Sequence, residues 1–274
     1  MGRLAADSAL AAGPGYGKVR AVLTLTSRQL CRCRRYTRCM FTILVANPKG
    51  GAGKSTLTTN IAGMLAQTKQ RVVIMDLDKQ QSATNWLARR PAMLPKIMAW
   101  NDDTDMEVLR AFSPQWMVVD THARLRRADR TYLLSRASVV LVPVNPSVFD
   151  IEATAKFLIK LHQDANVQSG KVAIGLIGSR TDSRTRMAQE LNSFFKRSGL
   201  PVVMFVPDSV VYPQCARDGV SIYDLPKNRA EQQVEAWQPL VDWLRTQIAR
   251  VRTNDAAAIA KVKATVEPGV VQIA

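Results

Sequence analysis

The chain has 274 residues, a formal net charge of +16 and a hydrophobic share of 47 %. This length allows one large or two small domains, and the apolar share is sufficient for a buried core. The longest apolar runs, such as residues 139–144, are far shorter than the roughly eighteen residues of a membrane-spanning helix, which favours a soluble protein. The basic excess favours polyanionic partners such as nucleic acid or anionic lipid.

Residues 1–39 differ in composition from the rest of the chain. They hold eight Lys/Arg, one Asp and three of the four cysteines, without the long apolar segment of a signal peptide. The run 31-CRCRRYTRC-39 lacks the histidine and the C-x-x-C spacing of zinc sites. We expect a disordered basic leader or a misassigned start, with Met40 as the natural one; a targeting segment is the competing interpretation. Only Cys215 follows, which favours a reducing, cytoplasmic setting.

Residues 40–252 alternate between apolar runs and helical patterns. The predicted strands are 42–47, 71–76, 96–100, 116–120, 138–144, 172–178 and 202–206. The predicted helices are 54–68, 82–90, 105–112, 128–136, 150–166, 183–197 and, near the end, about 230–252. The strands are β-branched and lack polar alternation, as expected of strands covered on both faces. This pattern predicts an α/β fold, a doubly wound and mostly parallel sheet with helices on both faces, followed by a flexible tail over 253–274.

The stretch 47-NPKGGAGKST-56 follows the first predicted strand and opens a helix. It fits the phosphate-binding pattern G-x-x-x-x-G-K-[ST], except that Pro48 replaces the first glycine. Backbone N–H groups and the positive end of the helix should hold a nucleotide's phosphates. Lys54 should reach the β- and γ-phosphates, and the Ser55 hydroxyl should bind Mg²⁺. The expected phosphate contacts are Gly50, Gly51, Ala52, Gly53, Lys54, Ser55 and Thr56.

Acidic residues end two other predicted strands. Asp76 and Asp78 leave the second strand on the same side, and Asp120 ends the fourth. Ligands of such sheets bind outside the carboxyl ends of the strands, so these carboxylates are expected beside the phosphate loop. Asp120 could hold Mg²⁺ through water. Asp76 and Asp78 could serve the metal and orient the attacking water, or could only cap the next helix.

The combination of motifs resembles the deviant-Walker ATPases of the ParA/MinD class over about residues 41–250. The residues that carry the resemblance are K-G-G-x-G-K-S at 49–55, 76-DLDKQQSAT-84, 120-DTHA-123 and the closing segment 219-GVSIYDLPKNRAEQQ-233. Lys79 and His122 replace prolines of the family pattern, and we assign His122 no chemistry. The resemblance implies a P-loop NTPase of the SIMIBI type.

The resemblance also implies the roles of individual residues. Lys49 would reach the phosphates of the other subunit in a nucleotide-sandwich homodimer, with Gly50 at the interface. Asp78 would orient the attacking water, and Asp76 would support the Mg²⁺ shell. Adenine would lie near Arg180, Pro207 and Asp208. ATP is favoured over GTP because 179-SRTD-182 lacks the lysine of a guanine-recognition element.

Three functions are compatible with this class. The favoured one is a ParA-like ATPase that binds DNA non-specifically as an ATP dimer, on the nucleoid, and positions a plasmid, a chromosome region or a protein organelle. A ParB-like or cargo-adaptor protein would stimulate its slow hydrolysis. Candidate DNA contacts, acting through phosphates, are Arg184, Arg186, Arg217, Lys227, Arg229 and Arg245, with Lys196, Arg197, Arg250 and Arg252 as further candidates.

The alternatives are a MinD-like membrane-associated ATPase and a P-loop metabolic enzyme. The first needs a C-terminal amphipathic helix with large apolar residues, whereas 255-DAAAIAKVKATVEPG-269 offers small residues and two lysines. No substrate motif supports the second, and a single cysteine in the domain excludes an iron–sulfur reductase. We therefore expect no membrane partner.

Overall fold

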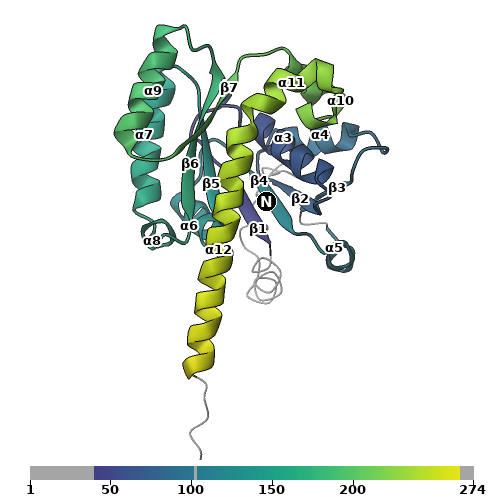
Figure 1. Cartoon of the computed structure of the whole chain (residues 1–274), viewed down its shortest axis with the longest axis vertical. Helices are drawn as coiled ribbons and strands as arrows, with labels where there is room; N and C mark the ends of the chain where they lie inside the picture. Colours follow the sequence, from purple (N-terminus) through teal and green to yellow (C-terminus); the bar gives the residue numbers. More distant parts are fainter. Residues whose placement is uncertain (1–39, 102–103, 266–274) are drawn as a thin grey trace, which may run out of the picture.

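The computed structural model describes residues 40–101 and 104–265, with side chains as far as residue 254. The predicted leader and the end of the predicted tail lie outside these ranges. A single seven-stranded sheet forms the centre of the fold (Figure 1). Its strands are β1 (Phe41–Val45), β2 (Val72–Asp76), β3 (Ile97–Ala99), β4 (Trp116–Asp120), β5 (Val139–Val144), β6 (Ala173–Thr181) and β7 (Val202–Pro207). All pairings are parallel, in the order β3-β2-β4-β1-β5-β6-β7.

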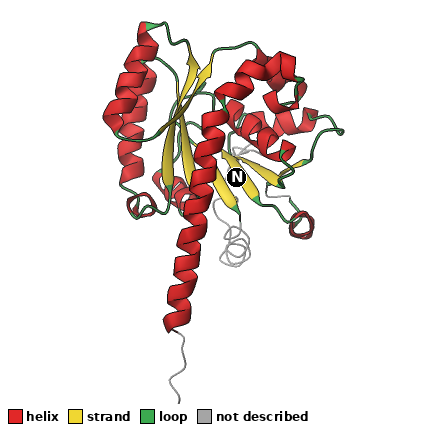
Figure 2. Cartoon of the chain, in the orientation of Figure 1, coloured by secondary structure: helices red, strands yellow, loops and turns green. Residues whose placement is uncertain are grey.

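Helices cover both faces of the sheet (Figure 2). They are α3 (Lys54–Gln67), α4 (Ser82–Arg89), α5 (Met106–Phe112), α6 (Arg127–Leu134), α7 (Val148–His162), α8 (Ala165–Gln168), α9 (Arg186–Ser198), α10 (Val211–Asp218), the 3₁₀ turn η1 (Ile222–Asp224), α11 (Lys227–Ala236) and α12 (Gln238–Thr265). The doubly wound α/β prediction is confirmed, and all seven predicted strands are present.

Side chains of each strand alternate between two separate apolar cores. In β1, Ile43 and Val45 pack with α3, α4, α10, α11 and α12, whereas Leu44 faces α5, α6, α7 and α9. All three are at most 1 % exposed. A strand covered on both faces has no polar side, which explains the missing polar alternation in the sequence.

The C-terminal helix differs from the prediction. The expected helix over 230–252 is divided at Trp237 into α11 and α12, and α12 continues to Thr265. Pro239 ends α11 because a proline ring clashes with the carbonyl four residues earlier, yet it is tolerated in the first turn of the next helix. Residues 240–265 contain neither glycine nor proline and are rich in alanine, so nothing stops α12 at residue 252.

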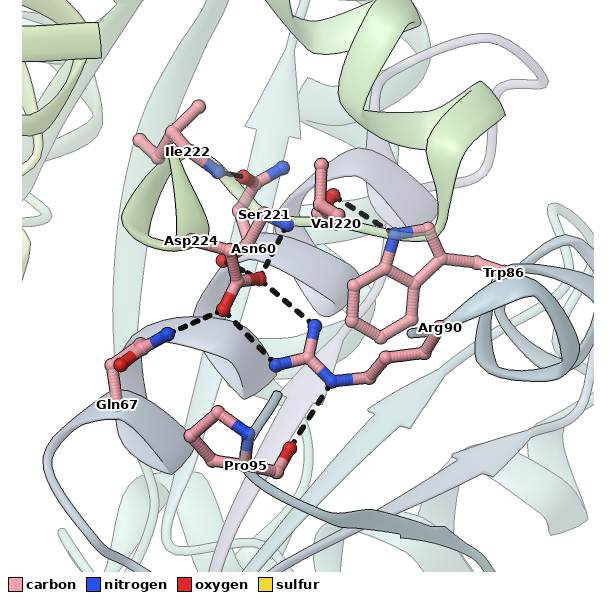
Figure 3. A network of polar contacts seen from close by, with 9 residues as sticks. All are labelled: Asn60, Gln67, Trp86, Arg90, Pro95, Val220, Ser221, Ile222 and Asp224. Atoms are coloured by element: carbon pink, nitrogen blue, oxygen red, sulfur yellow. Dashed lines mark hydrogen bonds and ion pairs between the residues drawn. The ribbon is translucent and has the colours of Figure 1, made fainter. Parts of the chain in front are cut away.

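A buried ion pair joins the closing segment, residues 219–233, to the helices α3 and α4, which start at the carboxyl edge of the sheet. The side chains of Arg90 and Asp224 are 5 % and 0 % exposed. Asp224 accepts two hydrogen bonds from the Arg90 guanidinium, at 2.9 and 3.1 Å, and one from Gln67 Nε2 at 2.6 Å (Figure 3). The backbone N–H and hydroxyl of Ser221 each donate at 2.7 Å. Asp224 is thus fully occupied by donors.

Close packing surrounds this ion pair. Asn60 Oδ1 accepts the Ile222 N–H at 2.9 Å, and Trp86 Nε1 donates to the Val220 carbonyl at 3.0 Å (Figure 3). Gly219 has φ +70°, and a Cβ there would overlap the Arg89 backbone. The segment after α10 is therefore fixed against both α3 and α4.

Replacing Asp224 by Asn should destabilise the fold by about 3–5 kcal/mol, because Arg90 is left buried without its counter-charge. Burial raises the pKa of Asp224, but the donors Arg90, Ser221 and Gln67 outweigh it and lower that pKa overall. A lowered folded pKa gives stability that is present above about pH 4 and is lost below it. The difference between wild type and Asp224→Asn, measured by urea unfolding, should therefore shrink on acidification.

The matched control is Asp218→Asn, which removes an exposed pair with Arg217. It should cost less than about 1 kcal/mol. Equal losses in the two variants would contradict the structural role of the buried pair.

Candidate nucleotide-binding site

Asn47 anchors the start of the loop between β1 and α3. It is 2 % exposed. Its Nδ2 donates to the Pro143 carbonyl at 2.8 Å and to Thr154 Oγ1 at 3.0 Å, and its Oδ1 accepts the Lys49 N–H at 2.7 Å. One side chain therefore connects the loop to β5 and α7. Sequence reasoning missed this role, which only its position at the end of a strand could have suggested.

Two glycines give the loop its shape. Gly51 and Gly53 have φ values of +74° and +90°, which favour glycine. A Cβ on Gly53 would lie 3.3 Å from Ser179 Oγ. Asn145 Nδ2 donates to the Gly51 carbonyl at 3.2 Å. This bond occupies the Gly51 carbonyl. In a glycine-rich loop that opens a helix, backbone N–H groups can be directed at a phosphate.

Lys54 is folded back onto the loop that precedes it. It is 6 % exposed, and its Nζ donates to the Lys49 carbonyl at 2.9 Å. Burial lowers the pKa of Lys54, while the charges of Asp120 and Asp78 act in the opposite direction. A buried ammonium held by one carbonyl can exchange that bond for a charge-assisted one to a phosphate.

Asp120 is a buried carboxylate in an unfavourable electrostatic environment. It is fully buried, and neither carboxylate oxygen has a hydrogen-bond partner among the described residues. Burial raises the pKa of Asp120 to about 7; the nearby Ser55 hydroxyl lowers it, Asp76 raises it and Lys54 lowers it. Such a carboxylate is costly unless a cation or donor joins it.

Ser55 and Asp120 fit the predicted Mg²⁺ site. Both oxygens of Asp120 are unsatisfied, and the Ser55 hydroxyl lies beside them. Within the described ranges no group of three or more His, Cys, Asp or Glu residues could hold a metal ion. Mg²⁺ bound with a nucleotide takes one or two protein ligands and completes its shell with water and phosphates. Ser55 and Asp120 would supply two such ligands.

Asp76 already has a structural task. Its Oδ1 accepts the Asp78 N–H at 3.0 Å, and its Oδ2 accepts the Thr84 N–H at 2.9 Å in the first turn of α4. The helix-capping alternative is therefore present, and the metal role of Asp76 stays a prediction. Asp78 lies close enough to Lys54 and Asp120 for its charge to raise the pKa of both. This proximity suits its predicted place beside the γ-phosphate.

The residues predicted to hold adenine meet at one corner of the sheet. The β6–β7 pairing is irregular between Gly178 and Thr181, and Thr181 pairs with Pro207. Arg180 lies inside this irregularity, exposed and with φ +51°. Asp208 follows Pro207 and is also exposed. Since Ser179 contacts the phosphate loop, this corner adjoins the phosphate site; a bound adenine there stays a prediction.

The predicted DNA contacts are exposed but mostly neutralised. Five of the six form ion pairs with acids close in sequence: Arg184 with Asp182, Arg186 with Glu190, Arg217 with Asp218, Lys227 with Glu231 and Arg245 with Asp242. Of the further candidates, Arg250 is committed to the fold. Its guanidinium donates to the carbonyls of Ser138, Gly170 and Lys171 and so attaches α12 to the amino ends of β5 and β6.

The sequence of this chain matches a known protein family. Residues 43–222 match the CobQ/CobB/MinD/ParA nucleotide binding domain. The chain belongs to this family. The predicted ParA/MinD class is therefore confirmed. The roles of Lys54, Ser55 and Asp120 in holding a nucleotide and its metal stay predictions.

Relatives within the family include proteins with a named task. The chain is 31 % identical over 193 residues to the maintenance of carboxysome distribution protein A of Halothiobacillus neapolitanus, covering 68 % of this chain and 88 % of the relative. Over 186 residues it is 30 % identical to the protein of the same name in Gloeobacter kilaueensis, covering 66 % and 82 %. An ATP complex of a Cyanothece McdA variant has a TM-score of 0.56 at 18 % identity, covering 74 % and 96 %, and shows the fold alone.

Replacing Asp120 by Asn should change how stability depends on pH in the Mg²⁺-free, nucleotide-free protein. A raised folded pKa means that the carboxyl costs stability progressively as pH rises from about 4 to about 7. The free energy of unfolding of Asp120→Asn, relative to wild type, should therefore increase by on the order of 2–4 kcal/mol across this range. It should not increase further above about pH 7. Thermal melting with a metal chelator measures it.

The exposed Asp208→Asn variant provides the control and should show no such gain. A constant difference between wild type and Asp120→Asn from pH 4 to pH 8 would refute the assignment of an unpaired, titrating carboxylate.

Proposed function

We propose that this protein is a ParA-like, Mg²⁺-dependent ATPase that dimerises on ATP, binds DNA without sequence preference and positions a cargo. The single observation that carries the nucleotide part is the buried Asp120, whose carboxylate has no hydrogen-bond partner among the described residues and lies near Ser55 and Lys54. A carboxylate, a hydroxyl and an ammonium at the opening of a glycine-rich loop supply a metal ligand pair and a phosphate cation.

The surroundings of Lys49 support the proposed ATP-dependent dimer. The backbone of Lys49 is fixed, since its N–H binds Asn47 and its carbonyl holds Lys54, but its ammonium forms no ion pair with the described residues. A Cβ on the neighbouring Gly50 would have no atom within 4 Å, so this side of the loop is open. A second subunit can approach here, and Lys49 then offsets the charge of its γ-phosphate.

Hydrolysis would be slow without a partner. Asp78 is the candidate for orienting the attacking water, and Lys54 and Lys49 would stabilise charge on the transferred phosphate. Ser55 and Asp120 would hold Mg²⁺, which would supply neutralising charge for the phosphates. A ParB-like or cargo-adaptor protein that rearranges these loops would accelerate turnover. ATP then controls the dimer, and hydrolysis releases it.

A protein organelle is the cargo favoured by the relatives, because both reported relatives at about 30 % identity are named for carboxysome distribution. DNA would serve as the track, and the basic excess of the chain supports this. None of the helices described for this chain is long and apolar enough to cross a membrane.

Lys49→Ala and Lys49→Gln should abolish ATP-dependent dimerisation and ATP hydrolysis, while monomer nucleotide affinity changes by no more than a few-fold. The reason is that Lys49 acts on the nucleotide of the other subunit. Light scattering of the protein with Mg²⁺ and ATP measures the dimer, and a fluorescent ATP analogue measures binding.

Lys96→Gln removes an exposed lysine elsewhere and should keep the ATP-dependent dimer. If the Lys49 variants still dimerise with ATP, the sandwich role of Lys49 is wrong.

Binding to random-sequence duplex DNA should require ATP and fall steeply with salt. The measurement compares ATP, ADP and no nucleotide across a salt series. Binding that is equal in the three states would show electrostatic attraction without nucleotide control, and no binding in any state would remove DNA from the proposed function.

A further inference from the structure

An arginine cluster follows Asp120 directly along the chain. The stretch 124-RLRRADR-130 holds four arginines and one aspartate, a net charge of +3 over seven residues. Residues 180–252, where the DNA contacts were predicted, hold 11 basic and 8 acidic residues, which is also +3 over 73 residues. The charge density after β4 is therefore about tenfold higher.

The side chains of these arginines have no polar partner among the residues that the structure describes. Arg124, Arg126 and Arg127 are exposed and Arg130 is half-buried. Their side chains form no ion pair or hydrogen bond with any residue in the described part of the chain, in contrast to the five paired DNA candidates. The half-buried Leu125 packs on the apolar core and holds this loop on the domain.

The cluster is even unfavourable in the isolated chain. Arg126 is the N-cap of α6 and Arg127 its first residue, and the cap makes no side-chain hydrogen bond. Positive charges at the positive end of a helix dipole cost about 0.3–1 kcal/mol each, and Asp129 is the sole acid of the first turn. An external anion would remove this repulsion.

The cluster also lies beside the nucleotide site. His122 Nδ1 accepts the Arg124 N–H at 3.2 Å. The same His122 is close enough to Asp129 at the start of α6, and to Asp78 and Lys54 in the site, for their charges to act on its pKa. The loop after Asp120 therefore connects the site to Arg124 by four residues of chain and one hydrogen bond.

We propose that Arg124, Arg126 and Arg127 bind the phosphate backbone of duplex DNA and make this binding depend on the bound nucleotide. This rests on the proposed function and names its DNA surface. Guanidinium groups bind phosphate oxygens in a bidentate manner, and unpaired arginines lose no internal partner on binding. A duplex is favoured over an acidic polypeptide because the whole chain, at +16, is attracted to a long polyanion.

The test uses the full chain, a random-sequence duplex and a salt series with ATP or ADP. The triple variant R124Q/R126Q/R127Q should lose roughly tenfold or more in ATP-dependent affinity. Its slope of log affinity against log salt should decrease by about 3, close to one for each phosphate contact. Binding of a fluorescent ATP analogue and ATP-dependent dimerisation should remain.

Three comparison variants make the result specific. K96Q/K156Q/K160Q removes the same charge from exposed sites elsewhere and should change affinity by less than about threefold. R124K/R126K/R127K keeps the charge but not the bidentate geometry, so it should keep the salt slope and lose less affinity than R124Q/R126Q/R127Q. R184Q/R186Q/R245Q removes the paired candidates and should have a small effect. If the first triple variant does not fold, the single variant R126Q should reduce the salt slope by about 1.

Several results would overturn the proposal. Wild-type affinity in R124Q/R126Q/R127Q, or a larger loss in R184Q/R186Q/R245Q, would place the DNA surface elsewhere while leaving the proposed function intact. Tighter, arginine-dependent binding to poly-L-glutamate than to DNA would assign the cluster to an acidic polypeptide. Failure of the wild type to bind DNA in any nucleotide state would instead refute the DNA part of the proposed function.

Discussion

The register of three neighbouring strands determines what this molecule can do. In the parallel pairing, Val45 of β1, Asp120 of β4 and Asp76 of β2 lie in one row at the carboxyl edge of the sheet. The phosphate loop follows Val45 directly, and Thr121 binds the Val45 carbonyl at 2.9 Å. This row brings the buried carboxylate of Asp120, at the end of β4, next to the start of α3, which follows β1. Asp120 therefore lies close to the positive end of the α3 dipole and to Lys54.

Much of this architecture is visible in the sequence because the forces that form it are local or periodic. Seven β-branched runs predict a sheet covered on both faces, and the pattern from Gly53 to Ser55 predicts the loop. The division at Trp237 and the continuation of α12 were missed, although Pro239 and the alanine-rich stretch carried the signal. The anchoring roles of Asn47, Asn145 and Ser179 have no local signal, since their partners lie 30 or more residues away in the chain or on another strand.

Which basic residues form ion pairs cannot be predicted from the sequence alone. A count of basic residues does not reveal that Arg184 pairs with Asp182 or that Arg250 donates its hydrogen bonds to backbone carbonyls. Both interactions depend on the three-dimensional arrangement of the groups. The structure sorts the cations into those already compensated and those left without a partner. Among the residues that the structure describes, Lys49 and the arginines after β4 belong to the second group, as Asp120 does among the acids. A buried carboxylate without a partner and positive charges at the start of a helix lower the stability of the free protein. Asp120, Lys49 and these arginines end or follow strands at the carboxyl edge of the sheet.

The attachment of α12 has a practical consequence. Arg250 binds the carbonyls of Ser138 and Lys171, which precede β5 and β6, so this part of the helix crosses the amino-terminal edge of the sheet. The phosphate loop lies at the carboxyl-terminal edge, and the last described turns of α12 extend away from the domain (Figure 1). A fluorophore or affinity handle joined to that end of α12 would therefore be separated from the proposed nucleotide site by the full height of the sheet. The movement of the protein in a cell could then be followed without obstructing that site.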